Sequence, residues 1–109
     1  MKVFLSHNMR GLTGVEIHDI REKAEAKIKE KFGDDVEFID NFNHATHIVG
    51  APPYSESNRL WHLGASIQQL GDADAVYFCY PHDTNSGCLV EKYIAALYGI
   101  RVLNDEMEN

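Results

Sequence analysis

The sequence predicts an α/β fold in which a parallel sheet carries helices on both faces. Apolar runs of strand length alternate with helical patterns along the chain, in the order strand, helix, strand, helix, strand, helix, strand. Right-handed crossovers between parallel strands then place the helices on both sides of the sheet. The length of 109 residues and the hydrophobic content of 44% are those of one globular domain. We therefore expect residues 1–109 to form a single domain.

The first strand and the first helix have the clearest signals. The run Lys2–Ser6 predicts a short strand that ends in a polar loop at residues 6–11. Thr13 and Glu16 have the spacing of a capping box, which begins a helix. Its apolar residues recur every three or four positions and form one stripe: Ile17, Ile20, Ala24, Ile28 and Phe32. Gly33 fits the left-handed position that ends such a helix.

The rest of the chain supplies three more strands and two more helices. Val36–Asp40 alternates enough to form the second strand. Residues 41–57 contain Pro52-Pro53 and no sustained period, which predicts a long connection, either a functional lid or a flexible insertion. The remaining elements are a helix from Ser57 to near Gly71, a strand at Ala75–Tyr80, a helix from near Ser86 to Gly99, and a strand at Ile100–Leu103.

Composition and charge exclude several classes of protein. The formal net charge of −7 argues against binding of a nucleic-acid polymer, because phosphate backbones select a basic face. This net charge is still compatible with binding of a single nucleotide by one or two basic side chains. No apolar run approaches the length of a membrane span, and the N-terminal run is too short for a signal peptide, so we expect a cytoplasmic protein without a membrane partner.

Neither the cysteines nor the histidines predict a metal site. Cys79 and Cys88 have no disulfide framework or metal-binding spacing, so both are expected to be free thiols, with Cys79 buried. His44 and His47 lie three residues apart in the long connection, without the helical platform and the third ligand of a zinc motif. We expect no metal.

The stretch Asp83–Glu91 is the most informative in the chain. It joins the third strand to the last helix, so Glu91 is expected near a helix start at the carboxyl edge of the sheet, where open α/β sheets bind ligands. The positive end of the helix dipole would keep this carboxylate ionised, as a nucleophilic glutamate requires. The same residue is also explained as an ordinary first-turn glutamate, because acidic side chains are common there.

A second polar loop is expected beside this stretch. The loops after the first and third strands lie side by side in such a sheet, which brings residues 6–11 to residues 80–91. Ser6, Asn8, Arg10 and Gly11 offer a hydroxyl, an amide, a guanidinium and a free backbone, which suit an anion such as a phosphate. The alternative is that Arg10 is a surface residue and Gly11 a turn.

Several short motifs, taken in order, resemble a known family. They are Met1–Ser6 followed by Asn8–Gly11, then Leu60–Ser66, then Ala73–Phe78, then Ser86-Gly87 with Glu91 four residues after the glycine. Together they resemble the nucleoside 2-deoxyribosyltransferase-like superfamily, and within it the small phage- and prophage-associated branch and the deoxynucleoside 5′-monophosphate N-glycosidases. The resemblance implies a flavodoxin-like three-layer sandwich with a mostly parallel sheet of four or five strands. It also implies cleavage of the N-glycosidic bond of a nucleoside or nucleotide, with no cofactor.

The resemblance assigns roles to individual residues. Glu91 falls on the family's nucleophilic glutamate, which forms a covalent ester with the sugar that water (hydrolase) or a second base (transferase) resolves. Asn85 falls where the transferases carry an aspartate and the monophosphate glycosidases a serine, and Arg10-Gly11 falls on an Arg-Gly pair that holds the 5′-phosphate. The expected catalytic set is Glu91, Asn85 and Asp83, and the expected substrate-binding set is Ser6, Asn8, Met9, Arg10, Gly11, Ser66, Ser86 and Gly87.

Two positions depart from the family pattern. Ser66 replaces an aspartate that handles the proton on the leaving base, and a serine is no carboxylic acid near neutral pH. Phe4 replaces a tyrosine that contacts the nucleophile. Asp83, His82 or His7 would then assist the leaving base, or the base leaves readily, or the protein binds a nucleotide without turnover. The resemblance further implies a homodimer or larger homo-oligomer, in which a neighbouring subunit helps to close the pocket.

Overall fold

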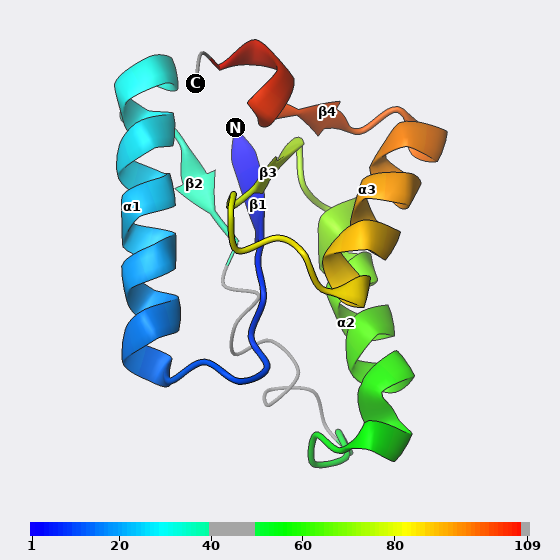
Figure 1. Cartoon of the computed structure of the whole chain (residues 1–109). Helices are drawn as coiled ribbons and strands as arrows, with labels where there is room; N and C mark the ends of the chain where they lie inside the picture. The colour runs from blue at the N-terminus through cyan, green and yellow to red at the C-terminus, as the bar shows by residue number, and fades with distance from the viewer. Residues whose placement is uncertain (40–49, 108–109) are drawn as a thin grey trace.

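The computed structural model describes residues 1–39 and 50–107, so His44, His47 and most of the predicted long connection lie outside the described residues. The chain follows the predicted alternation of strands and helices (Figure 1). The elements are β1 (Lys2–Ser6), α1 (Gly14–Phe32), β2 (Glu37–Phe38), α2 (Arg59–Gly71), β3 (Ala75–Phe78), α3 (Ser86–Tyr98) and β4 (Arg101–Val102), with 3₁₀ turns η2 (Glu56–Asn58) and η3 (Leu103–Glu106).

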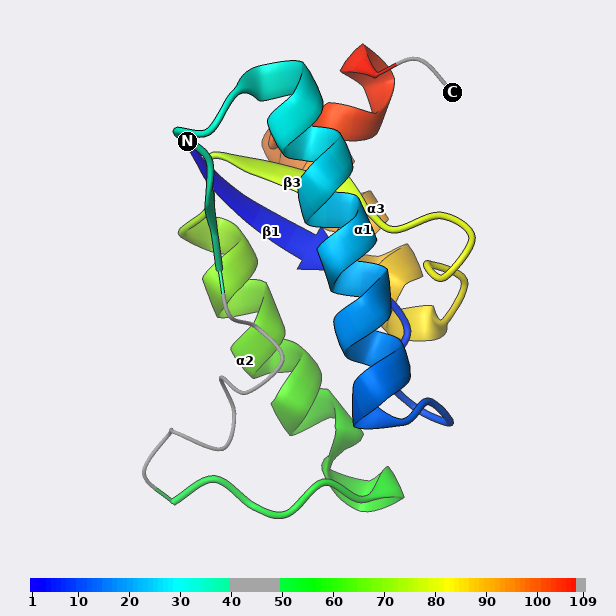
Figure 2. The ribbon, with the colours of Figure 1, turned by 90° about the vertical axis from the view of Figure 1, so that its left-hand side faces the viewer.

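The four strands form one parallel sheet in the order β2-β1-β3-β4. This is the flavodoxin-like order, in which the chain changes direction of winding between β1 and β3. Helix α1 covers one face of the sheet, and α2 and α3 cover the other (Figures 1 and 2). The predicted α/β class, with helices on both faces of a parallel sheet, is confirmed. Ser6, at the end of β1, pairs in register with Phe78, at the end of β3.

Strand β1 is buried on both sides, which explains its continuous apolar run. Val3 and Leu5 pack in the cluster beneath α1, whereas Phe4 packs in the cluster shared with α2 and α3. Because successive side chains of a strand point to opposite faces, Ser6 follows the direction of Phe4. The strand therefore delivers one hydroxyl to the α2 and α3 side, at its carboxyl end.

The helix ends follow the predicted caps, with one difference. Glu16 N–H donates to Thr13 Oγ1, and the Glu16 carboxylate accepts from Thr13 N–H, both at 3.1 Å, so the capping box is confirmed. Gly33 has the expected positive φ of 91°, but its ψ of −179° is extended and not left-handed helical. Its N–H still donates to the Lys29 carbonyl, and the chain then leaves α1 extended toward β2. Gly99 takes the left-handed conformation at the end of α3, with φ 67° and ψ 30°.

β1 has the predicted bounds, whereas the other three strands are shorter than predicted. β2 and β4 each contain two residues, because an edge strand has only one neighbour and pairs only where the two chains run together. β3 ends at Phe78 and not at Tyr80, since His82 N–H donates to the Cys79 carbonyl and turns the chain out of the sheet. A 3₁₀ turn precedes α2, so this helix begins at Arg59 and not at Ser57.

Candidate functional site

The side chain of Glu91 lies where three elements meet at the carboxyl end of β1. Only 5% of the residue is exposed. Ser6 Oγ, from β1, donates to Glu91 Oε1 at 2.9 Å, and Ser66 Oγ, from α2, donates to Glu91 Oε2 at 3.1 Å. Both carboxylate oxygens are therefore held by hydroxyl groups that are distant in sequence. We call Glu91, Ser6 and Ser66 the serine–glutamate cluster.

Burial opposes the effect that we predicted for the helix dipole on the pKa of Glu91. Glu91 lies in the second turn of α3, and the dipole effect fades within the first turn. Desolvation raises the pKa of Glu91, and the hydrogen bonds from Ser6 and then Ser66 oppose that rise because they favour the charged form. The helix begins near Ser86, as predicted, with Asn85 as its N-cap, so Glu91 lies close to the helix start but in the second turn.

The loops after β1 and β3 lie side by side, as predicted, and Asn8 joins them. Asn8 N–H donates to the His82 carbonyl at 2.6 Å, and Asn8 Nδ2 donates to Thr84 Oγ1 at 3.3 Å. Asn8 Oδ1 accepts from the backbone N–H of Asn85 at 2.9 Å. Asn8 thus uses its backbone and both ends of its amide to fix the approach to α3.

Asn85 and Asp83 have partners of their own near the start of α3. Asn85 Oδ1 accepts from Cys88 N–H at 2.8 Å, so Asn85 is the N-cap of α3. Asp83 is 6% exposed and forms an ion pair with Lys92 Nζ at 2.8 Å. Ser86 is exposed at the first position of α3, and the half-buried Gly87 follows it. These residues surround the entry to the helix that carries Glu91.

Arg10 lies at the edge of this region and forms an ion pair with Glu56 of η2. Both side chains are mostly exposed, and Glu56 also pairs with Arg59 at 3.5 Å. Gly11 has a φ of 82°, which a glycine adopts without strain in a turn. Met9 is half-buried, and its carbonyl accepts from Leu12 N–H at 3.3 Å. The loop after β1 is therefore tied to the segment that leads into α2.

Behind Asn8, the structure reveals a contact that the sequence did not predict. His7 is 5% exposed, Arg21 Nη1 of α1 lies 3.0 Å from its Nε2, and the Asn8 carbonyl lies 3.1 Å from its Nδ1. Arginine only donates, so Nε2 accepts and Nδ1 carries the proton. Burial lowers the pKa of His7. The hydrogen bond to the Asn8 carbonyl raises this pKa, and the positive charge of Arg21 lowers it. One feature of the sequence could have predicted this contact. Arg21 lies four residues after Ile17 and three before Ala24, so it falls within the apolar stripe of α1.

The thiols are buried, as predicted for Cys79. Burial raises the pKa of Cys79 to about 12 and that of Cys88 to about 11, although the Ser6 hydroxyl favours the Cys88 thiolate. Such thiols stay protonated and are weak nucleophiles at neutral pH. Within residues 1–39 and 50–107, no three His, Cys, Asp or Glu side chains gather as metal ligands. None of the helices in those ranges is long and apolar enough to cross a membrane.

The strand order and the helices on both faces define an α/β protein with a flavodoxin-like parallel sheet (Figure 1). No family model and no curated protein sequence matches the chain. Among solved structures, the chain is similar to the 2-deoxyribosyltransferase of the psychrotolerant bacterium Bacillus psychrosaccharolyticus, with a TM-score of 0.62. The similarity covers 94% of this chain and 69% of the other, at 14% sequence identity. At that identity the likeness concerns the fold, and it agrees with the fold implied by the sequence motifs.

Proposed function

We propose that this protein cleaves the N-glycosidic bond of a deoxynucleoside or its 5′-monophosphate, with Glu91 as the nucleophile. One observation carries the proposal, namely a nearly buried carboxylate held at both oxygens by Ser6 and Ser66. It lies at the carboxyl edge of a sheet between β1 and β3, which is where open α/β sheets bind ligands. The likeness in fold to a deoxyribosyltransferase supports the same chemistry.

The reaction uses the carboxylate as an oxygen nucleophile. A Glu91 oxygen bonds to the anomeric carbon while the carbon–nitrogen bond breaks, and the base leaves with the electron pair. Water or a second base then attacks the same carbon and frees the carboxylate, which gives net retention. Ser6 and Ser66 hold the carboxylate in one orientation, and each oxygen keeps a lone pair for the sugar.

Departure of the base requires help that Ser66 does not give. Its hydroxyl already donates to Glu91, and a hydroxyl is a poor acid near neutral pH. Among residues 1–39 and 50–107, Asp83 is the other buried carboxyl group, and we assign it the role of assisting the leaving base. Asn85, Ser86 and Gly87 then border the sugar, since they form the first residues at the start of α3.

The first loop supplies the phosphate site in this proposal. Ser6, Asn8 and Met9 lead to the turn at Gly11, and this loop would border the phosphate at the edge of the sheet. Arg10 exchanges its partner Glu56 for the 5′-phosphate when the substrate enters. A phosphate carries more charge than one carboxylate and accepts paired donors from the guanidinium, so it competes well for Arg10.

A second copy of the chain is the expected partner. Leu89, Tyr93 and Leu97 repeat every four residues along α3 and are 56%, 68% and 64% exposed, and Leu60 of α2 is 73% exposed. Apolar side chains in such a row are typical of a protein interface. Sedimentation should show a dimer or larger assembly that Leu97→Glu weakens. A monomer at every concentration would contradict this assignment.

The decisive experiment is incubation with a panel of nucleosides and 5′-monophosphates, followed by chromatography for free base. We expect Glu91→Gln to abolish base release and to leave binding largely intact, because it removes the charge with little change in volume. Glu30→Gln, on the exposed face of α1, is the matched control and should retain activity. Release of base by Glu91→Gln at the wild-type rate would refute the assignment of Glu91 as the nucleophile.

A second candidate function is a nucleotide-binding module without turnover. The observation that favours it is Ser66, which occupies the position of a proton-handling acid and uses its hydroxyl on Glu91. In that case nucleotides raise the melting temperature without releasing base, Arg10→Ala weakens binding, and Glu91→Gln has little effect. The same panel, read by chromatography and by thermal melting, separates the two functions.

A further inference from the structure

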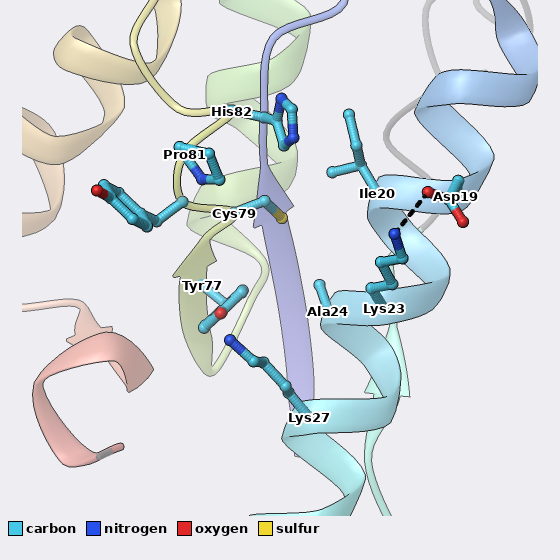
Figure 3. A pocket seen from close by; sticks show the side chains of 10 residues that line it. Asp19, Ile20, Lys23, Ala24, Lys27, Tyr77, Cys79, Pro81 and His82 are labelled. Atoms are coloured by element: carbon cyan, nitrogen blue, oxygen red, sulfur yellow. Dashed lines mark ion pairs between the residues drawn. The ribbon is translucent and has the colours of Figure 1, made fainter. Parts of the chain in front are cut away.

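A pocket lies on the α1 face of the sheet, opposite the face that carries Glu91. It has a volume of about 280 Å³ and lies between α1 and the end of β3 (Figure 3). Tyr77 and Cys79 line it and pack in the α1 cluster, whereas Phe78 between them packs in the α2 and α3 cluster. The alternation of β3 therefore separates this pocket from the serine–glutamate cluster. Its volume is close to the lower end of the range for small-molecule sites.

The floor of the pocket is apolar, and the rings of Pro81 and His82 form one of its walls (Figure 3). Ile20 and Ala24 of α1 face Cys79 across the cavity. Ala24 and Cys79 are 5% and 3% exposed, so this floor belongs to the core. Such a surface fits a planar, apolar body better than a flexible polar one.

Tyr77 and Lys27 are among the polar side chains of the pocket that have no protein partner within residues 1–39 and 50–107. Tyr77 lines the pocket, and its hydroxyl makes no hydrogen bond in those ranges; this hydroxyl is not fully buried, so it can be solvated from the pocket. Lys27 forms no ion pair in those ranges, and its ammonium group extends toward the Tyr77 hydroxyl (Figure 3). The neighbouring Lys23, by contrast, is paired with Asp19 at 3.0 Å. One ammonium and one hydroxyl donor thus converge on an apolar cavity.

We propose that this pocket binds a small aromatic monocarboxylate. The carboxylate would accept from Lys27 Nζ and from the Tyr77 hydroxyl, and the ring would lie between Ile20 and the Pro81 wall. A single negative charge matches the single unpaired ammonium group. Asp19 also lines the pocket, and its carboxylate disfavours a second negative charge on the ligand because like charges repel. Lys23 does not offset this repulsion for the ligand, since it is already paired with Asp19. This site is independent of the proposed cleavage reaction.

The test is an amide-shift titration of ¹⁵N-labelled protein with benzoate at constant ionic strength. We expect saturable shifts in the amides of residues 23–27, 77–80 and 82. Benzamide, which has the same ring without the charge, should bind at least tenfold more weakly. Lys27→Met should weaken benzoate binding at least tenfold and Tyr77→Phe severalfold. Lys31→Met, on the same helix but outside the pocket, should bind like the wild type.

The outcomes separate this site from the proposed active site. Glu91→Gln should bind benzoate as the wild type does, whether or not the protein releases base from nucleotides. Absence of saturable shifts would overturn the proposal. So would equal binding by Lys27→Met and the wild type, or shifts centred on Ser66 and residues 86–91 without any change in α1. Preserved dispersion of the amide spectrum shows that each variant is folded.

Discussion

Replacement of Ser6 by alanine tests how the serine–glutamate cluster controls its carboxylate. Ser6 is 1% exposed, and its hydroxyl donates to Glu91 Oε1 at 2.9 Å. Burial raises the pKa of Glu91, and the Ser6 hydrogen bond is the larger of the two effects that lower it again. Ser6→Ala removes that bond and leaves the burial, so the pKa of Glu91 should rise further.

The size of the effect follows from the difference between two hydrogen bonds. A hydrogen bond to an ionised group contributes about 1.5–3 kcal/mol, and one to a neutral group about 0.5–1.5 kcal/mol. The ionised form of Glu91 therefore loses about 1–1.5 kcal/mol more than the protonated form when Ser6 is replaced. This is roughly a tenfold increase in the affinity of Glu91 for its proton.

Two measurements report the change. The acid limb of the pH profile of kcat/KM for base release follows the free enzyme, and it should move to higher pH in Ser6→Ala. Carbon-13 NMR of the labelled glutamate carboxyl groups gives the same answer without any need for activity. Ser55→Ala is the matched control, because the Ser55 hydroxyl contacts that of Ser57 at 3.0 Å, in the turn before α2. A Glu91 titration that is unchanged, or moves to lower pH, in Ser6→Ala would refute the reasoning.

Three other changes have definite expected outcomes. Glu91→Gln should raise the melting temperature at pH 7. The pKa of Glu91 is higher in the folded chain than in the unfolded chain, so the stability contributed by this group is present at low pH and is lost as the pH rises through the folded pKa. The gain in melting temperature should therefore disappear near pH 4. A melting temperature of Glu91→Gln below that of the wild type at pH 7 would contradict the burial argument. Glu56→Gln releases Arg10 and should tighten binding of a deoxynucleoside 5′-monophosphate by at most about fivefold, since the pair is exposed, with no effect on the nucleoside; calorimetric titration of both ligands decides the matter. Asn85→Ala removes the N-cap of α3 and should lower the free energy of unfolding in urea by about 1 kcal/mol, whereas Asn85→Asp should retain it; equal losses in the two variants would argue against the cap.

The position of Ser6 changes the interpretation of the missing tyrosine. In the resemblance drawn from the sequence, Phe4 falls where the family carries a tyrosine, and Phe4 lies fully buried in the core shared with α2 and α3. Ser6 is two residues further along the same face of β1, and it supplies a hydroxyl to Glu91. Ser66 supplies a second one from α2. The chain thus places two short hydroxyl side chains on the carboxylate, an arrangement that no local motif indicated.

The sequence by itself determined the elements and the layers of this protein. Periodicity, the Thr13 capping box and the alternation of strands with helices are local properties, so they predicted the parallel sheet and the helices on both faces. They also placed Glu91 and the loop after β1 at one edge. The strand ends were less well predicted, because pairing at the edges depends on a neighbouring strand and not on the strand's own residues.

Only the tertiary structure decided which side chains meet. Ser6 and Ser66 bind Glu91 across 85 and 25 residues of sequence, and Arg21 reaches His7 from the next element along the chain. Arg10, expected at an anion, is paired with Glu56. Burial also raises the pKa of Glu91, an effect that its place in a helix did not predict. Contacts between distant residues, and the desolvation that they cause, arise from packing, and local patterns in a sequence carry no record of them.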